Sequence, residues 1–234
     1  MTANLPNVQI LLLTYGRTDK SIRTIQSTCK NLSYPKELLS WYVCDDGSPK
    51  NEFDTVVNTI EGLGHKIIGS HNKRMRNLGD ENSFHAGKGY NLGLGICYQK
   101  SDFVLVLEND WELDEPLDLV PYVKLLQERE DVGICSFRIL SVGADVHTIG
   151  HDGRIYLKYQ RTTQYAYSGN PYLRHARYTK RYGWFVEDRN PGLMELEQDD
   201  RYRIATENLI DIWRPLDINS WGAWKHIGDV KTWK

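Results

Sequence analysis

The feature that most constrains the fold is a regular alternation of short apolar runs with segments whose apolar residues recur at helical spacing. Residues 8–14 (VQILLLT) form a continuous apolar run, typical of a strand covered on both faces in a parallel sheet. Between Thr18 and Leu32 the spacing predicts a helix, with Thr18 or Asp19 as its cap. Further strands are predicted at residues 38–44, 66–69 and 103–107, with helical spacing between them. This order predicts an α/β fold with a doubly wound, mostly parallel sheet flanked by helices.

The second half of the chain has a different character. After a predicted helix over residues 117–126 and a predicted strand over residues 132–139, residues 151–190 hold eight Lys or Arg against three Asp or Glu, with seven tyrosines among them. This segment shows no long helical pattern, and we expect it to form a small, irregular and partly β lobe over one face of the sheet. A final helix is predicted from the spacing of Tyr202, Ala205, Leu209 and Ile212.

Acidic residues follow two of the predicted strands at the point where each strand ends. Asp45 and Asp46 follow the second strand, and Glu108, Asn109 and Asp110 follow the fourth. Ligands of open parallel sheets bind beyond the carboxyl ends of the strands, so these side chains are expected near one crevice. Mg²⁺ and Mn²⁺ prefer such oxygen ligands, with phosphate oxygens completing their coordination. Each cluster alone is also typical of a solvated turn or helix cap, but together they favour a site for a cation and a nucleotide diphosphate.

Four segments of the first half resemble the successive sequence blocks of family 2 GT-A glycosyltransferases, in the family's order and at typical separations. They are VQILLLTYGR (8–17), WYVCDDGS (41–48), AGKGYNLGL (86–94) and FVLVLENDWEL (103–113). The resemblance implies a Rossmann-like GT-A fold, with residues 1–140 as the nucleotide-sugar-binding half. Residues 141–234 would form the acceptor-side lobe, final helix and tail of one compact domain. It also implies a metal-dependent hexosyltransferase that moves a sugar from a UDP-type nucleotide-sugar donor to a hydroxyl acceptor, with inversion and with Mn²⁺ or Mg²⁺ as cofactor.

The same resemblance implies roles for donor-side residues. Thr14, Tyr15 and Arg17 would line the nucleotide pocket, and Asp45 or Asp46 would hydrogen-bond the base or ribose. The block at 86–94 would contact the diphosphate or sugar through Lys88 and Asn91. Asn109 would also belong to the residues that bind the donor. Tyr90 stands where the family often has an arginine, so Lys88 would supply the positive charge; a solvated helix lysine is the equally weighted alternative.

Three residues are implied as the metal site. Asp110 would ligate the cation, with Glu108 beside it in the position that the family usually fills with aspartate. His226, in WKHIGD, would close the metal or diphosphate site, because imidazole can ligate Mn²⁺ or hydrogen-bond a phosphate. A structural histidine is the alternative. The flanking Trp221 and Trp224 predict that this tail packs against the domain.

A general base is expected in the run MELEQDDRY at residues 194–202. Enzymes of this type place an acidic base at the start of a helix, where the helix N-terminus favours a carboxylate that can take the proton of the acceptor hydroxyl. The candidates precede the predicted final helix. We expect Asp200 to be the base, with Asp199, Glu197 and Glu195 as alternatives. For each of them the other interpretation is a charged residue at the start of a helix, without a catalytic role.

The acceptor is open at this point. The basic, tyrosine-rich segment from Tyr156 to Arg189 suits either sugar rings or nucleic acid, since both stack on aromatic rings. A glycan or other hydroxyl acceptor is expected, with a hydroxymethylated base in viral DNA as the alternative; a tyrosine-rich surface packed on its own core would serve neither. An alternative from a different functional class is a nucleotide-sugar-binding protein or a nucleotidyltransferase. Residues 8–17 contain only Gly16, whereas nucleotidyltransferases usually begin with a glycine-rich loop.

Composition bears on the compartment. The 234 residues carry a formal net charge of -2 and four scattered cysteines without metal-site or disulfide spacing. No run approaches the roughly 18 apolar residues of a membrane span, and the start of the chain lacks the features of a signal peptide. We therefore expect no membrane span and a cytoplasmic protein, in a cell or in an infected host cell.

Overall fold

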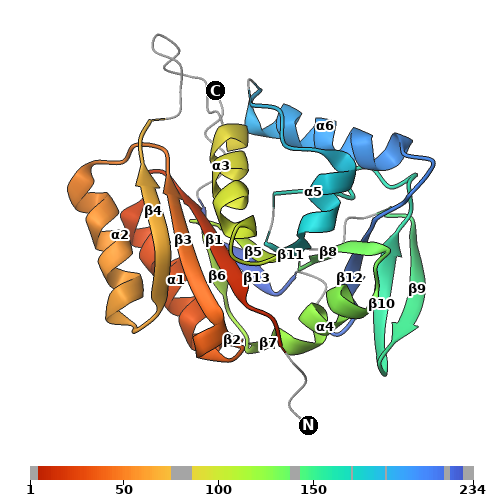
Figure 1. Cartoon of the computed structure of the whole chain (residues 1–234), viewed down its shortest axis with the longest axis horizontal. Helices are drawn as coiled ribbons and strands as arrows, with labels where there is room; N and C mark the ends of the chain where they lie inside the picture. The colour runs from red at the N-terminus through yellow and green to blue at the C-terminus, as the bar shows by residue number, and fades with distance from the viewer. Residues whose placement is uncertain are drawn as a thin grey trace.

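The structure is a computed structural model that describes residues 5–74, 86–137, 143–169, 171–187, 189–218 and 222–228. Its central feature is a nine-stranded sheet in the order β4-β3-β1-β5-β11-β8-β12-β10-β9 (Figure 1). The strands are β1 (Val8–Thr14), β3 (Leu39–Asp45), β4 (Lys66–Asn72), β5 (Phe103–Glu108), β8 (Val132–Ser136), β9 (Val146–His151), β10 (Arg154–Tyr159), β11 (Tyr172–His175) and β12 (Asp211–Pro215). Strands β10 and β11 run against the other seven. The predicted α/β class with a mostly parallel sheet is confirmed.

Six helices and several short elements make up the rest of the regular structure in the described ranges. The helices are α1 (Thr18–Asn31), α2 (Lys50–Gly62), α3 (Ala86–Tyr98), α4 (Val120–Glu128), α5 (Ala176–Tyr182) and α6 (Pro191–Ile204). A 3₁₀ turn, η1, spans Lys36–Leu38, and two small sheets pair β6 (Trp111–Leu113) with β13 (Trp224–His226) and β2 (Leu32–Ser33) with β7 (Leu117–Asp118). Among the described residues, no helix is both long enough and apolar enough to cross a membrane.

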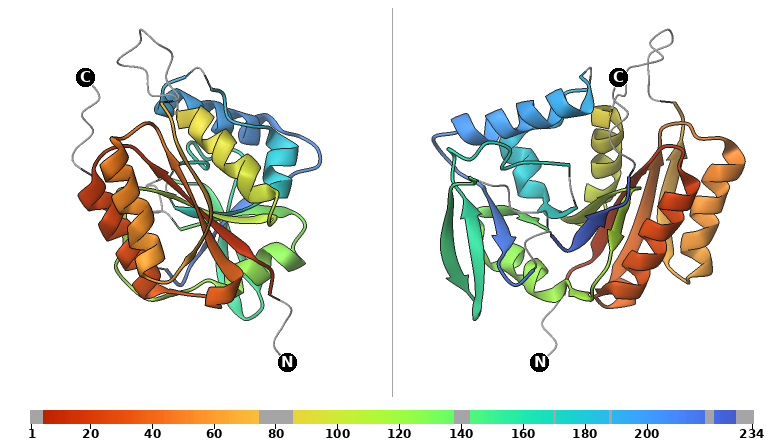
Figure 2. Two further views of the ribbon diagram at one scale, coloured as in Figure 1. Left: turned by 60° about the vertical axis from the view of Figure 1, so that its left-hand side comes forward. Right: turned by 180° about the vertical axis from the view of Figure 1, so that it is seen from behind.

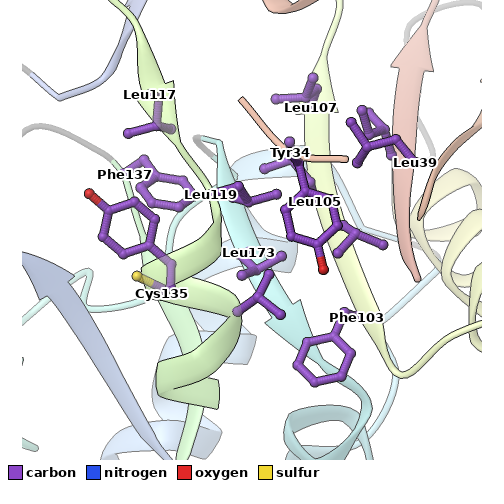
Figure 3. Close-up of a cluster of buried hydrophobic side chains, with 14 of the residues drawn as sticks. Tyr34, Leu39, Phe103, Leu105, Leu107, Leu117, Leu119, Cys135, Phe137 and Leu173 are labelled. Atoms are coloured by element: carbon purple, nitrogen blue, oxygen red, sulfur yellow. The ribbon is translucent and has the colours of Figure 1, made fainter. Parts of the chain in front are cut away.

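Side-chain alternation along the central strands places a hydrophobic core on each face of the sheet. On β1, Val8, Ile10 and Leu12 join one cluster, whereas Leu11 joins the other. Strand β5 alternates in the same way, and Figure 3 shows its Phe103, Leu105 and Leu107 packed in the first cluster. Because both faces are covered, both side-chain rows must be apolar, which explains the continuous apolar runs in the sequence.

The helices divide between these two cores. Helices α1, α2 and α4 contribute to the first cluster, and α3, α5 and α6 contribute to the second. Figure 2 shows α1 and α2 on the opposite side of the sheet from α3. The loops at the carboxyl ends of β1, β3 and β5 are consequently flanked by α1 on one side and by α3 and α6 on the other.

Four local predictions need correction. Neither Thr18 nor Asp19 caps α1; the cap position is Arg17, in left-handed backbone, and no side chain caps the helix. The predicted strand 66–69 continues to Asn72, and the predicted helix 117–126 begins at Val120, after β7. The predicted strand 132–139 ends at Ser136, and its last two residues lie outside the described ranges, as do Trp221 and Trp233 of the tail.

The predicted final helix is wrong. Helix α6 covers residues 191–204, whereas Leu209 lies beyond it and Ile212 belongs to strand β12. The overlooked signal is Asn190 followed by Pro191: the Asn190 side chain accepts a hydrogen bond from Leu193 N, and Pro191 fills the first turn, where no N–H partner is needed. Residues 211–215 form a strand because they pair with β8 and β10, a tertiary contact that local spacing does not report.

His175 gives the fold a specific acid sensitivity. Its Nδ1 accepts a hydrogen bond from Arg177 N at the start of α5, and burial, followed by the charge of Arg177, lowers the pKa of this imidazole to about 4. The unfolded state therefore takes up a proton first as the pH falls below about 6.5. We expect the free energy of unfolding to decrease by about 1–2 kcal/mol from this group between pH 8 and pH 5. Urea titrations at the two pH values measure it.

The matched variant is His175→Asn, which can still cap α5 but does not titrate. It should remove this part of the pH dependence, whereas His147→Asn, on the exposed side of β9, should leave it. An unchanged pH dependence in His175→Asn would show that the neutral imidazole is not what acid disrupts.

Candidate functional site

A buried amide joins the ends of the two central strands. Asn109, which follows β5, donates from Nδ2 to Thr14 Oγ1, Gly16 O and Ser21 Oγ, each at 3.2 Å. Thr14 Oγ1 in turn lies 3.1 Å from Ser21 Oγ. Thr14 and Asn109, both predicted to be donor-site residues, thus hold the loop 15–17 against the end of β5 with their polar atoms directed at each other.

The end of β3 is tied to the same loop through Ser48. Asp45 is buried and accepts hydrogen bonds from Ser48 N (2.6 Å) and Ser48 Oγ (2.7 Å), while Gly16 N donates to Ser48 Oγ at 2.7 Å. Burial raises the pKa of Asp45, and the bonds from Ser48 oppose the rise. The Asp45 carboxylate therefore supports this turn. The backbone N–H of Asp46 donates to Thr14 O at 3.0 Å, which ties the residue after β3 to the end of β1.

Asp110 lies next to two basic side chains. Its Oδ2 is 2.8 Å from Arg17 Nη1 and 3.3 Å from His226 Nε2. The Asp110 side chain is 11% exposed, whereas those of Arg17 and His226 are 47% and 44% exposed. Asp110 therefore forms the floor of this site, and the two basic groups are at its solvent side. Sequence reasoning had selected all three residues, from positions as far as 209 residues apart.

The small sheet of β6 and β13 explains how His226 reaches Asp110. His226 pairs with Trp111, and the centroids of the two rings are 4.9 Å apart. Ile227 N donates to Asp110 O at 2.8 Å, and Trp224 is 2% exposed, so the described residues 222–228 pack against the domain, as predicted for Trp224. Gly228 is required there, because a Cβ at this position would lie 2.6 Å from Asp110 Oδ2.

The Asp110–His226 pair fits one edge of a divalent-cation site. Two ligands at right angles around a cation, each at about 2.1 Å, lie about 3 Å apart, close to the 3.3 Å between Oδ2 and Nε2. Within the described ranges, no group of three or more His, Cys, Asp or Glu side chains is arranged to hold a metal ion. A cation at this pair would need its other ligands from water and phosphate oxygens, as is usual for Mg²⁺.

Glu108 contacts Tyr90 and lies close to a second acidic side chain, Glu195. Tyr90 OH donates to Glu108 Oε1 at 2.8 Å. Burial, followed by the charges of Asp110 and Glu195, raises the pKa of Glu108 to about 8. Glu108 therefore holds its proton more strongly than an ordinary carboxyl does.

Glu195 reaches the same place from α6. Its Oε1 accepts a hydrogen bond from Gly169 N at 2.8 Å. A Cβ on Gly169 would lie 2.4 Å from Glu195 Oε1, 3.1 Å from Tyr90 OH and 3.4 Å from Glu108 Oε1. One backbone position therefore touches all three groups, and Gly169 and Tyr90 are the residues of this cluster that sequence reasoning did not assign to the site. Their contacts come from separate elements, so no local pattern marks them.

The other three base candidates have different surroundings. Asp199 is buried and accepts from Tyr165 N (2.8 Å) and Tyr167 N (3.0 Å), so its carboxylate holds that loop. Glu197 pairs with Arg201 at 2.8 Å, and Asp200, 64% exposed, faces Arg203 at 3.5 Å. All four acidic residues lie inside α6 and none at its first turn, which corrects the expectation that they precede a helix.

The block at residues 86–94 is held by a segment from the second half. Asn91 Nδ2 donates to Phe185 O and Glu187 Oε1, and its Oδ1 accepts from Phe185 N, all at 2.9 Å. A Cβ on Gly87 would lie 2.2 Å from Val186 O. Asn91 therefore binds the chain at 185–187. Lys88 is half-buried in the first turn of α3, and Tyr15 is exposed beside the crevice.

The tyrosine-rich segment forms a core. Six of its seven tyrosines are buried: Tyr156, Tyr159, Tyr167, Tyr172, Tyr178 and Tyr182. Arg174 is also buried, with its guanidinium 4.8 Å from the ring centre of Tyr178. Tyr165 is the exposed member of the seven. The aromatic surface that motivated a nucleic-acid acceptor is thus largely internal, and that alternative loses its support.

Comparison with known proteins places the fold. No protein-family model and no curated protein matches the chain. Among solved structures, S. aureus TarS 1-349 in complex with UDP has a TM-score of 0.59 at 15% identity, covering 89% of this chain and 60% of that one. The mannosyltransferase PcManGT from Pyrobaculum calidifontis, in complex with GDP-Man and Mn²⁺, has a TM-score of 0.53 at 14% identity, covering 90% and 57%.

These neighbours are glycosyltransferases, and the mixed sheet with helices on both faces is their GT-A type of fold. The chain spans 36% of a longer TarS structure, which it matches with a TM-score of 0.58 at 14% identity. It therefore corresponds to part of the length of each of these proteins. The likeness establishes the architecture, and activity rests on the residues of the site.

Proposed function

We propose that the chain is a glycosyltransferase that moves a sugar from a nucleotide diphosphate sugar to a hydroxyl acceptor. The observation that carries the proposal is that the two carboxylates at the end of β5 have different partners. Asp110 turns toward His226 and Arg17, whereas Glu108 turns toward Tyr90 and Glu195. A site for charge on the diphosphate and a separate proton-accepting group are the two requirements of direct displacement at a sugar carbon.

Donor binding uses the crevice beyond β1, β3 and β5. Asp46 and Tyr15 flank the place for the nucleoside, and Arg17 with Asp110 and His226 faces the diphosphate. A bound Mn²⁺ or Mg²⁺ would neutralise charge on the departing diphosphate. The structure with bound UDP and that with GDP-Man and Mn²⁺ support a nucleotide-sugar donor, and we assign a UDP-type donor.

Glu195 is the base in this proposal, in place of Asp200. Its carboxylate lies close enough to Glu108 for its charge to raise the pKa of that carboxyl, whereas Asp200 is on the exposed side of α6. Gly169 N fixes one oxygen of Glu195, which orients the carboxylate for taking a proton from the acceptor hydroxyl as it attacks. Attack assisted by a base on the side opposite the diphosphate gives inversion at the sugar.

A thermal-shift panel of UDP, GDP and TDP sugars, with and without Mn²⁺, tests the donor assignment. A ligand present at about 100 times its dissociation constant adds about 2.7 kcal/mol to stability, which raises Tm by roughly 5 °C for a chain of this size. We expect the largest rise with a UDP sugar and Mn²⁺ together. Uridine and Mn²⁺ alone are the controls, since neither supplies a diphosphate. No rise with any sugar nucleotide would refute the proposed function.

A further inference from the structure

We propose that Arg17 couples the binding of the divalent cation to the binding of the diphosphate. Without nucleotide, the Arg17 guanidinium neutralises Asp110; when a nucleotide diphosphate binds, Arg17 moves to its phosphate oxygens and leaves the Asp110 carboxylate to the cation. The inference rests on the proposed function, because it concerns the same donor site. It adds that the two ligands depend on each other: the cation and the diphosphate each bind well only when the other is bound.

The geometry places the Arg17 guanidinium and the cation in competition for one oxygen of Asp110. Arg17 Nη1 (2.8 Å) and His226 Nε2 (3.3 Å) both approach Oδ2 of Asp110. A cation bridging Oδ2 and Nε2 would lie close to the guanidinium, and two positive charges at that distance repel. Arg17 must therefore leave Oδ2 for a cation to use the Asp110–His226 edge.

Of the two partners, Arg17 is the one built to move. Its side chain is 47% exposed, whereas that of Asp110 is 11% exposed and its backbone is held by Ile227 N. Arg17 has a φ of 49°, directly after Gly16 at 55°, so the guanidinium is aimed across the strand ends by left-handed backbone. A rotation about the side-chain bonds carries it from Asp110 toward the solvent side, with no change in the core.

A diphosphate offers Arg17 a better partner than Asp110. Guanidinium groups bind phosphate oxygens through two parallel hydrogen bonds, and a diphosphate carries more charge than one carboxylate. The site is also at the start of α1, a fourteen-residue helix with no side-chain cap, and helix N-termini favour anions. The exchange thus keeps every charge paired: Arg17 with phosphate, and Asp110 with the cation.

This exchange predicts a measurable linkage. Mn²⁺ alone should bind weakly, because it has to displace Arg17, and UDP should strengthen Mn²⁺ binding. Couplings between two ligands of one protein are about 5–150-fold, and each ligand must strengthen the other by the same factor. Some coupling also comes from direct cation–phosphate bonds, so removing Arg17 should reduce the coupling and leave part of it.

The experiment is an Mn²⁺ titration followed by the electron paramagnetic resonance of free Mn²⁺, with and without UDP. It compares the unaltered protein with Arg17→Gln, which removes the charge, and Arg17→Lys, which keeps it. We expect Arg17→Gln to bind Mn²⁺ alone at least about 5-fold more tightly, to bind UDP alone more weakly and to show smaller coupling. Arg17→Lys keeps the charge but loses the paired hydrogen bonds to phosphate, so its Mn²⁺ affinity and coupling should lie between those of the unaltered protein and Arg17→Gln. Arg23→Gln, on the exposed side of α1 and paired with Glu112, is the matched control.

The outcomes separate the two proposals. If Mn²⁺ and UDP bind and strengthen each other, but Arg17→Gln binds Mn²⁺ no more tightly than the unaltered protein, the coupling role of Arg17 is wrong and the donor site stands. If the unaltered protein binds neither UDP nor Mn²⁺ with UDP, the proposed donor site is wrong and the inference fails with it. The assay measures binding only and needs no acceptor.

Discussion

Replacing Asp110 with asparagine should reduce donor turnover on the order of 10³-fold. The substitution keeps the size of the side chain but removes the negative charge that faces Arg17 and His226. Without that charge a cation keeps only His226 and phosphate oxygens as its ligands, and charge on the departing diphosphate is less well compensated. Hydrolysis of the donor, with water in the acceptor's place, measures the loss. The Mn²⁺-dependent rise in Tm should disappear as well.

The control for this experiment is Asp114→Asn, the same change four residues away at an exposed position. It should turn over donor at the rate of the unaltered protein. Full turnover by Asp110→Asn in Mn²⁺ would contradict the assignment of this carboxylate. A melting temperature of Asp110→Asn that falls by many degrees would instead indicate that the Asp110 carboxylate stabilises the fold.

Glu195→Gln should reduce turnover by 10²- to 10⁴-fold, the usual contribution of a positioned general base. Glutamine can still accept the hydrogen bond from Gly169 N, so the loop stays in place while the proton acceptor is lost. Donor binding should be nearly unaffected, because Glu195 faces the acceptor side. The loss should therefore appear in kcat and leave the thermal shift with donor and Mn²⁺ unchanged.

Three variants make this test specific. Asp200→Asn and Glu197→Gln change carboxylates on the same helix that face Arg203 and Arg201, and both should retain turnover. Gly169→Ala keeps the Glu195 carboxylate but places a methyl group 2.4 Å from its Oε1, so it should lower kcat by displacing the base. If Asp200→Asn lost activity while Glu195→Gln kept it, the base would be Asp200, as the sequence alone suggested.

The acceptor side has a structural basis that the sequence obscured. Most tyrosines of residues 151–190 are core residues beneath α5 and α6, and the loop 165–169 is held on α6 by backbone bonds to Asp199 and Glu195. The loop 165–169, which lies beside Glu195, is therefore the part of this lobe that we propose to face an acceptor. Such a surface is compatible with a sugar or another small hydroxyl compound, and the donor assays above do not depend on its identity.

Local pattern was sufficient for the first half of the fold. The continuous apolar runs of β1, β3 and β5 follow directly from burial on both faces of the sheet, and the helical spacing of α1, α2 and α3 from burial of one stripe. It was insufficient for β12, whose residues 211–215 are a strand because β8 and β10 lie beside them. Pairing partners distant in the chain decide such segments, and the spacing of Tyr202, Ala205, Leu209 and Ile212 says nothing about them.

The sequence by itself determined that carboxylates, Asp110 among them, follow the parallel strands, because strand ends and residue chemistry are local properties. The tertiary structure alone decided which carboxylates act together. In the folded chain Asp110 pairs with Arg17 and His226, and Asp45 is hydrogen-bonded to Ser48. Glu195 lies near Glu108, where Gly169 and Tyr90 bind the two carboxyl groups. The physical reason is that hydrogen bonds and charge pairs depend on distances of about 3 Å between atoms, and only the packing of α6 and the tail against the sheet sets those distances.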